Sequence, residues 1–139
     1  MFLKPRGQQD PVDRVCCNGD ELATVSSAKY LGVIFDDDLS WQSHIQHLAS
    51  QTGKAVSRLW RHGDALSITA RRIWYVAMIQ AKLCYAANAF FPSLSAAGLT
   101  RLERSAKSGV RAILRLQNPV ATQPLRERLS LSTIEILFQ

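Results

Sequence analysis

The spacing of apolar residues changes once along the 139-residue chain, near Asp38, and this change constrains the fold more than any other feature of the sequence. Before it, short runs alternate between apolar and polar residues or are rich in β-branched and aromatic side chains, which is typical of strands. After it, apolar residues recur about every 3.6 positions, as on one face of an α-helix. The sequence therefore predicts an α+β fold that is mainly α, with its strands at the N-terminus.

Two strand signals precede Asp38. The runs RVCC and ELATV flank an Asn18-Gly19-Asp20 turn and predict a β-hairpin, because Asn-Gly between alternating runs favours a tight hairpin turn. The run from Lys29 to Phe35 predicts a third strand, which Gly32 interrupts. A glycine at such a place often marks a bulge, or a point where another backbone or a ligand comes close. Residues 1–40 are therefore expected to form a β-rich segment.

Three helices are predicted after the strands. The first starts at a Ser40 or Asp38 cap and ends near His62-Gly63. The second starts at a Ser67 or Thr69 cap and ends at Pro92. The third starts near Ser95 and stops at Asn118-Pro119. Residues 41–117 would form a three-helix bundle, and residues 118–139 a linker and a truncated helical tail that contains the turn PLRERL.

Each predicted helix has an apolar face that would point into the bundle. In the first helix this face is Trp41, Ile45, Leu48, Thr52, Ala55, Val56 and Leu59. In the second helix it is Ile73, Val76, Ala77, Leu83, Cys84 and Ala87. In the third helix it is Leu99, Leu102, Ala106, Val110 and Ile113.

Positive charge is concentrated in the helical part of the chain. The net charge is +6, but residues 1–40 hold four Lys/Arg against seven Asp/Glu, and residues 41–139 hold thirteen against four. A local excess of nine positive charges favours a polyanionic partner, with nucleic acid first and an anionic membrane second.

The third helix carries a row of cations. At 100° per residue, five of them share a stripe of about 120° opposite the apolar face; these are Arg101, Arg104, Lys107, Arg111 and Arg115. Glu103 is the only acidic residue near the stripe, whereas solvated helix faces usually mix the two signs. Contact with phosphates and plain solvation both remain open as interpretations of this stripe.

The three consecutive aspartates Asp36, Asp37 and Asp38 raise the question of a catalytic metal cluster. Two-metal chemistry requires carboxylates from separate elements that converge on ions about 4 Å apart, and the sequence offers no second acidic cluster. The exit of a strand into a helix N-terminus, where negative charge suits the helix dipole, explains the triplet more simply. His44 and His47 lack a Cys or acidic residue at metal spacing, so no metal or other cofactor is predicted.

Other sequence features bear on the cell compartment and on membranes. Cys16, Cys17 and Cys84 make neither a disulfide framework nor a zinc motif, which favours an intracellular location, in the nucleus or the cytoplasm. Met1 to Leu3 is too short for the core of a signal peptide, so secretion is not expected. The apolar stretch 73–91 could span a bilayer by length, but Gln80 and Lys82 lie at its middle, so no membrane span is predicted.

The order of these residues resembles a known family. Tyr30-Leu31-Gly32-Val33, followed by Asp36 or Asp38, LSW and His44-Ile45, resembles the segment after the palm in reverse transcriptases of non-LTR retrotransposons, the LINE-like and jockey-type elements. Further along, Tyr85 resembles the tyrosine of that family's second post-palm helix, and Leu102-Glu103-Arg104 resembles its L-E-R motif. The stretch PLRERLSLSTIEIL is similar to the family's leucine-rich segment, so the resemblance covers nearly all of the chain.

The resemblance implies a role in holding a template–primer duplex. In the family, the Y-L-G strand belongs to the primer-grip hairpin, and the helices after it form the thumb. Tyr30, Leu31 and Gly32 would then approach the primer backbone, and Arg104, Lys107 and Arg111 of the basic stripe would face phosphates.

The resemblance also implies what this chain does not do alone. The parent activity is RNA-directed DNA polymerisation, which uses Mg²⁺ held by aspartates of the palm, and nothing between Met1 and Lys29 matches the palm signature. The chain is therefore expected to be an inactive fragment of the thumb region. Its remaining role would be sequence-nonspecific binding of RNA–DNA or DNA duplex backbone, with no small-molecule substrate.

Two alternative hypotheses remain at this point. One is a helical protein-interaction or scaffold module, in which Trp41, Trp60 and Trp74 are partly exposed anchors and the basic face is incidental. The other is a chain that does not fold stably by itself, because its hairpin and tail leave apolar surface uncovered. Binding to a polyanion, oligomerisation without such binding, and the absence of cooperative unfolding would distinguish the three hypotheses.

Overall fold

The structure, a computed structural model, describes residues 16–21, 25–117 and 122–131. It confirms an α+β fold that is mainly α: two small antiparallel strand pairs are followed by helices. The chain divides into two compact units, Met1–His44 and Ile45–Gln139. No helix in the described ranges is long and apolar enough to cross a membrane.

The first strand pair is the predicted hairpin. β1 (Cys16–Cys17) pairs with the antiparallel β2 (Asp20–Glu21), and Asn18-Gly19 forms the turn with φ angles of 56° and 91°. Positive φ at both central residues is the type I′ geometry, whose twist matches that of the flanking strands. The outer residues of the predicted runs, Arg14, Val15 and 22–24, lie outside the described residues.

The second strand pair corrects the prediction of a single strand from Lys29 to Phe35. β3 (Ser27–Tyr30) and β4 (Val33–Asp36) are antiparallel neighbours in which Tyr30 pairs with Val33. Leu31 and Gly32, with φ angles of 46° and 83°, form a second two-residue turn between them. Gly32 is thus a turn residue and not a bulge, and the Tyr30-Leu31-Gly32 segment lies at the tip of a hairpin.

The aspartates after β4 lead into a helix N-terminus. The Asp36 carboxylate accepts hydrogen bonds from the Ser43 backbone N–H (3.3 Å) and the Ser40 hydroxyl (3.2 Å). Asp38 accepts from the Ser40 backbone N–H at 3.0 Å. Asp36 therefore supplies an acceptor for an N–H group of the first helical turn, which has no partner within the helix. This geometry supports a strand exit and helix start as the role of the triplet.

The first predicted helix is confirmed. α1 (Gln42–His62) ends where the sequence indicated, and the predicted apolar face is buried throughout. Its one polar member, Thr52, is fully buried and donates its hydroxyl hydrogen to the Leu48 carbonyl at 2.8 Å. The regular 3.6-residue period of the apolar side chains was therefore sufficient to identify this face.

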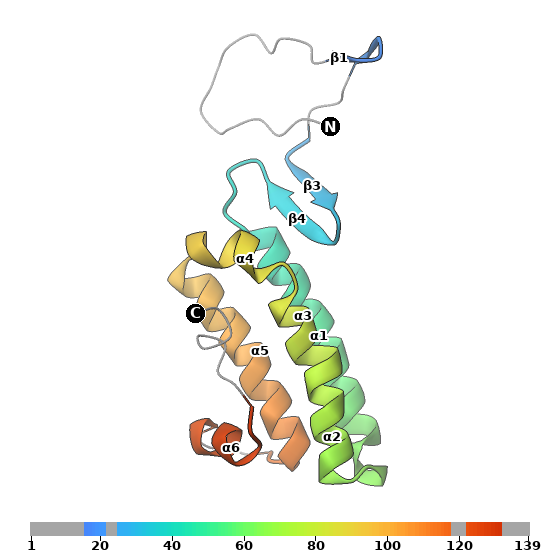
Figure 1. Ribbon diagram of the computed structural model, residues 1–139, viewed down its shortest axis with the longest axis vertical. Coiled ribbons are helices and arrows are strands. Elements are labelled where there is room, and N and C mark those ends of the chain that lie inside the picture. Colours follow the sequence, from blue (N-terminus) through green and yellow to red (C-terminus); the bar gives the residue numbers. More distant parts are fainter. Residues whose placement is uncertain (1–15, 22–24, 118–121, 132–139) are drawn as a thin grey trace. The chain divides into compact units, whose positions relative to one another are not determined.

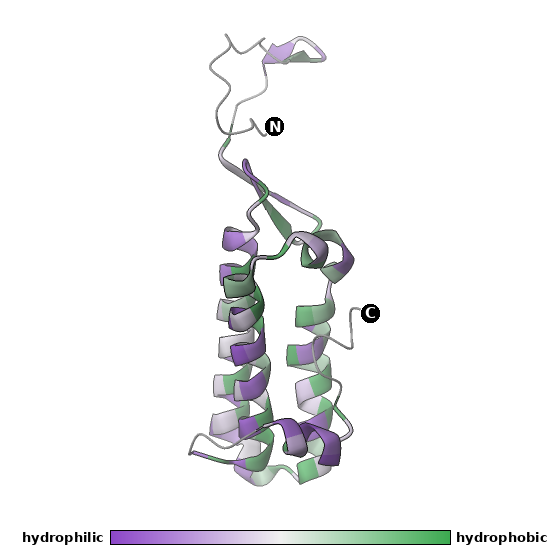
Figure 2. Cartoon of the chain, turned by 90° about the vertical axis from the view of Figure 1, so that its left-hand side faces the viewer, coloured by the Kyte–Doolittle hydropathy of each residue, from purple (hydrophilic) through white to green (hydrophobic). Residues whose placement is uncertain are grey.

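Three long helical segments lie side by side in the second unit (Figure 1). They are α1, a composite segment of α2 (Ile68–Tyr75), the π-helix η2 (Val76–Gln80) and α3 (Ala81–Cys84), and α5 (Ala96–Leu114). Shorter elements complete the unit: η1 (Gly63–Ala65), α4 (Ala87–Phe90), η3 (Phe91–Ser93) and α6 (Gln123–Arg128). The long segments carry both hydrophobic and hydrophilic stretches (Figure 2), as expected of amphipathic helices that share a core.

The second predicted helix is only partly correct. Ser67 caps it as predicted, because its hydroxyl accepts from the Ala70 N–H at 3.2 Å. The helix does not continue to Pro92: it ends at Cys84, and Ala86 adopts a left-handed conformation with a φ of 53°. The predicted inner residues Leu83 and Ala87 are buried, but Ile73, Val76 and Ala77 are exposed.

The π-helix explains the misplaced face. A π-turn has more residues per turn than an α-turn, so it shifts the helix face that precedes it relative to the face that follows. The buried residues before and within η2 are Tyr75 and Ile79, each fully enclosed, and Leu83 follows four positions later. Steps of 3.6 residues back from Leu83 lead to Ile79 and then to Val76 in place of the buried Tyr75, and the same steps back from Cys84 lead to Ala77 and Ile73, which are exposed.

The third predicted helix is confirmed, and two arginines of α2 support the helices around it. Ser95 caps α5 by accepting from the Gly98 N–H at 3.2 Å. Arg71 donates from Nη1 to the Ile113 carbonyl at 2.7 Å, and Arg72 donates from Nε to the Leu129 carbonyl at 2.6 Å. Carbonyls at helix C-termini lack partners within the helix, so these arginines stabilise the ends of α5 and α6.

The predicted helical turn PLRERL is also present as α6, whose C-terminal residues Leu129 and Leu131 donate backbone hydrogen bonds to the Arg126 carbonyl. The third helix was predicted to run to Asn118-Pro119, but α5 ends at Leu114, where Arg115 adopts a left-handed conformation with a φ of 58°. The segment TIEILF lies outside the described residues.

Candidate nucleic-acid interface

The α5 helix separates apolar and basic residues onto different sides. Leu102, Ala106, Val110 and Ile113 are buried, as predicted, and Leu99 is half-buried. The predicted cations lie on the remaining surface, although with different exposures. Arg101 and Arg104 are exposed, whereas Lys107 and Arg111 are half-buried. The first two are therefore the most accessible cations of α5.

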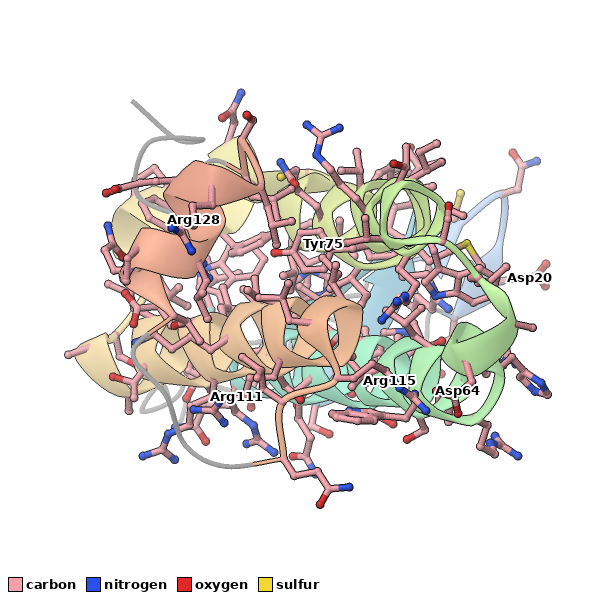
Figure 3. All side chains as sticks on the ribbon, turned by 90° about the horizontal axis from the view of Figure 1, so that it is seen from below. Asp20, Asp64, Tyr75, Arg111, Arg115 and Arg128 are labelled. Carbon is pink, nitrogen blue, oxygen red and sulfur yellow. The ribbon has the colours of Figure 1, made fainter. Side chains whose placement is uncertain are left out.

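Two cations of the stripe are less free to bind an anion. Lys107 forms an ion pair with Glu103, one helical turn earlier, at 2.8 Å. Arg111 lies on the side of α5 away from Tyr75 (Figure 3), and its Nε is buried without a hydrogen-bond partner among the described residues. An incoming phosphate would have to compete with Glu103 for Lys107 and would reach only part of the Arg111 guanidinium.

Arg115 does not belong to the helical stripe. The helix ends at Leu114, and Arg115 is its C-terminal cap in the left-handed conformation, with a φ of 58°. Its guanidinium donates to the Trp60 carbonyl, pairs with Asp64 and lies 5.0 Å from the centre of the Trp60 ring. Figure 3 shows Arg115 and Asp64 together at one end of the bundle. The expected position on a continuous stripe is therefore wrong, and Arg115 connects the end of α5 to α1.

A groove lies beside the two exposed arginines. It is formed by α1 and α5, encloses a volume of about 520 Å³, and is lined by Gly53, Val56, Ala97, Arg101, Arg104, Ser105 and Ser108. Among the residues that the structure describes, none of those that line it is acidic. The Arg101 and Arg104 guanidinium groups have no ion-pair partner in the part of the chain that the structure describes. Among the described residues, the groove thus combines two arginines that have no ion-pair partner with the Ser108 hydroxyl.

Sequence analysis did not single out the small residues of this groove. Nothing lies within 4 Å of the position that a Cβ atom would take at Gly53, so this glycine leaves the floor of the groove open. Ser105 and Ser108 follow Arg104 by one and four positions on α5. Small residues interleaved with the cations of one helix face could have indicated a groove, but only the packing of α1 against α5 places Gly53 opposite them.

The predicted primer-grip residues form an exposed hairpin tip in the first unit. Tyr30 is 66% exposed and Leu31 is 72% exposed, and Gly32 is also exposed. Leu31 holds a positive φ, which is uncommon for a residue with a large side chain. The structure thus places two apolar side chains on the surface of the tip, while the basic residues of α5 belong to the second unit.

The acidic and histidine residues do not gather into a metal site. The described residues contain no group of three or more His, Cys, Asp or Glu side chains positioned to hold a metal ion. His44 is fully buried, and its Nδ1 accepts a hydrogen bond from the Ile34 backbone N–H at 3.3 Å. This histidine therefore has a structural contact with β4.

The buried Tyr75 phenol and the half-buried Cys84 thiol are expected to make the stability of the protein fall at alkaline pH. Burial raises the pKa of the Tyr75 phenol above 10.0, with the nearby Arg126 opposing the shift and Cys84 adding to it; burial also raises the pKa of Cys84 above 9.0. As the pH rises past these ordinary values, the unfolded chain loses the protons first. The stabilising contribution is therefore complete below pH 9 and is lost at higher pH.

Urea unfolding between neutral pH and about pH 11 measures this dependence. We expect the unfolding midpoint to fall above the ordinary pKa of tyrosine, and we expect the Tyr75→Phe variant to show a smaller fall. Equal pH profiles for the two proteins would contradict the assignment to Tyr75.

Comparisons with known proteins identify no relative: no family model, no curated protein and no solved structure matches this chain.

Proposed function

We propose that this chain binds the phosphate backbone of nucleic acid through the groove between α1 and α5, as a non-catalytic fragment of the thumb type. The observation that carries the proposal is the pair of exposed arginines, Arg101 and Arg104, in a groove to which the described part of the chain contributes no carboxylate. Backbone phosphates supply most of the nonspecific affinity of nucleic-acid-binding proteins, and arginine matches their geometry with several donors. The Ser108 hydroxyl could donate to the same phosphates, whereas the Ser105 hydroxyl already donates to the Arg101 carbonyl at 3.2 Å.

The distribution of charge supports a nucleic-acid partner as well. The chain holds a net charge of +6, and residues 41–139 hold thirteen Lys/Arg against four Asp/Glu. Such an excess attracts a polyanion over a distance of about 10 Å at moderate salt. The resemblance to non-LTR reverse transcriptases points in the same direction, because the thumb of those enzymes holds a template–primer duplex.

The alternative of a scaffold anchored by tryptophans loses support. Trp41 is buried, and its ring lies 5.4 Å from that of Phe35 within the first unit. Trp60 is half-buried and packs against the Arg115 guanidinium. Trp41 is therefore not available as an exposed anchor, whereas Trp60 and Trp74 are half-buried.

A salt titration with charge-reversal variants tests the proposal. Anisotropy of a labelled RNA–DNA duplex should give an observed affinity that falls steeply with salt, with a log–log slope of about 0.9 for each phosphate neutralised. The double variant Arg101→Glu, Arg104→Glu should bind at least about tenfold more weakly, with a smaller slope. Both residues are exposed, so helicity by circular dichroism should not change.

Arg128→Glu is the matched control for the single variant Arg104→Glu. Arg128 is exposed on α6 and does not line the groove, but its reversal changes the net charge by the same amount. We expect Arg128→Glu to affect binding much less than Arg104→Glu. Equal losses would assign the binding to overall charge, and affinity that does not depend on salt would refute backbone binding altogether.

A further inference from the structure

In the composite segment of α2, η2 and α3, buried residues recur at every fourth position. Tyr75, Ile79 and Leu83 are buried, each with at most 2% of its surface exposed. Ala77 and Ala81 lie midway between these positions, on the opposite face, and both are exposed. Ile73, before them in α2, and Tyr85, directly after the end of α3, are exposed as well. The π-helix maintains this spacing, because its wider turn compensates for the drift that a four-residue period would accumulate in an α-helix.

This outer face is apolar along its length. Ile73 is 61% exposed, Tyr85 is 53% exposed, and Ala77 and Ala81 lie between them. Val76, next to Ala77, is 40% exposed. A helix that is apolar on opposite faces is usually covered on both, and contiguous exposed apolar surface marks sites of interaction. The core of the bundle covers only the face that contains Tyr75 and Ile79.

The outer face has the shape that a second helix requires. Ala77 and Ala81 are small and lie between the larger Ile73 and Tyr85, so the middle of the face is lower than its ends. Small residues at a crossing point permit helix axes to approach to about 8 Å. A helix that crosses at Ala77 and Ala81 could therefore contact both alanines and pack against the larger side chains.

The charges around the face define the chemistry of that helix. Lys82, which is half-buried, occupies a position beside the apolar row, whereas the Arg72 guanidinium donates to the Leu129 and Ser130 carbonyls. The sequence contains no Asp or Glu between Asp64 and Glu103. A second copy would bring the same lysine to the interface, together with another helical region that has a large positive excess. Acidic residues at the edges of the incoming helix would instead pair with this lysine.

We propose that the outer face, formed by Ile73, Val76, Ala77, Ala81 and Tyr85, binds an acidic amphipathic helix of a partner polypeptide. The partner contributes an apolar stripe over the two alanines and carboxylates beside Lys82. This interaction does not involve the groove between α1 and α5, so it is independent of the proposed binding of nucleic acid.

Two designed peptides and the full chain test the proposal. Both peptides carry the same leucine and alanine stripe at helical spacing, but one has glutamates and the other lysines at the flanking positions. We expect the glutamate peptide to bind in an anisotropy titration and the lysine peptide to bind at least about tenfold more weakly. Ala81→Glu should lower the affinity for the glutamate peptide by at least about tenfold, because it places a like charge at the crossing point.

Three variants make the result specific. Lys82→Glu should lower the affinity for the glutamate peptide and raise the affinity for the lysine peptide. Ser57→Glu, an exposed change on α1 with the same change of charge as Ala81→Glu, should have little effect. Arg104→Glu should leave peptide binding nearly unchanged, so a failure of nucleic-acid binding and a failure of this interaction can be told apart.

Several outcomes would overturn the proposal. Binding of neither peptide, or equal binding of both, would show that the face does not select an acidic helix. A dimer in sedimentation equilibrium that Ala81→Glu dissociates would assign the face to a second copy. Binding to vesicles that contain phosphatidylserine, abolished by Ala81→Glu, would assign it to a membrane surface.

Discussion

Replacing Gly109 with alanine is expected to destabilise the protein, although alanine is the better helix former. Gly109 lies buried within α5, where a Cβ atom would stand 2.6 Å and 2.8 Å from the ring carbons Cε2 and Cδ2 of Tyr75 and 3.1 Å from Cδ1 of Ile79. Tyr75 is itself buried, so its ring has little space into which it could move. Overpacking of this kind costs about 1 to 3 kcal/mol, which exceeds the gain of about 1 kcal/mol in helix propensity.

Gly53→Ala is the matched control for this prediction. Gly53 lies within α1, and nothing is found within 4 Å of the position that its Cβ atom would take. The change to alanine therefore alters only the helix propensity of this position. We expect a gain of about 0.5 to 1 kcal/mol in the free energy of unfolding from urea titrations. If Gly109→Ala were also stabilising, the close approach of α5 to Tyr75 would be refuted.

The sequence was sufficient to predict the buried face of a helix where one period of about 3.6 residues held along the whole helix. In α1 every predicted inward residue is buried, including Thr52, because no irregular turn interrupts the helix. In the second segment the same method placed Ile73 and Val76 inside although both are exposed. The cause is the π-helix, whose extra residue is stabilised by tertiary packing against α5 and has no recognised sequence signal.

The turn at Leu31-Gly32 shows a second limit of sequence analysis. The Asn18-Gly19 turn carries the favoured pair for a type I′ geometry and was predicted, whereas Leu31 is a poor residue for positive φ and concealed an equivalent turn. The continuous apolar run around Gly32 therefore suggested one strand where the structure has two.

The basic residues of α5 show which part of the candidate site could be predicted. The side of the helix that they occupy follows from the apolar face and was predictable. The hydrogen-bond and ion-pair partners of these cations can be distant in sequence. Arg115, for example, contacts Trp60 and Asp64 across a helix interface. The groove itself requires that Gly53 of α1 and Arg104 of α5 line the same space, and no local pattern in a single sequence encodes that arrangement.

The largest loss of stability is expected from Leu102→Ala. Leu102 is a fully buried residue of α5, and it lies next in sequence to the exposed Arg101 of the groove. Truncation of a buried leucine costs about 2 to 5 kcal/mol, because the cavity that remains closes only in part. Domains of this size are stable by only about 5 to 15 kcal/mol, so this variant should lose a large fraction of its stability in a urea titration.

Leu99→Ala provides the control one helical turn earlier, because Leu99 is half-buried and its truncation removes fewer contacts. We expect its cost to be clearly smaller than that of Leu102→Ala. A similar cost for both would show that α5 does not turn the Leu102 face into the core.

Leu102→Ala and Arg104→Glu together separate folding from binding on a single helix. Leu102→Ala should lower the affinity for a duplex only in proportion to the fraction of unfolded chains, and a condition that restores folding should restore binding. Arg104→Glu should lower the affinity at unchanged stability, because its guanidinium is exposed and makes no ion pair among the described residues. If binding instead followed stability in both variants, the arginine would act through the fold, and the groove would not be the binding surface.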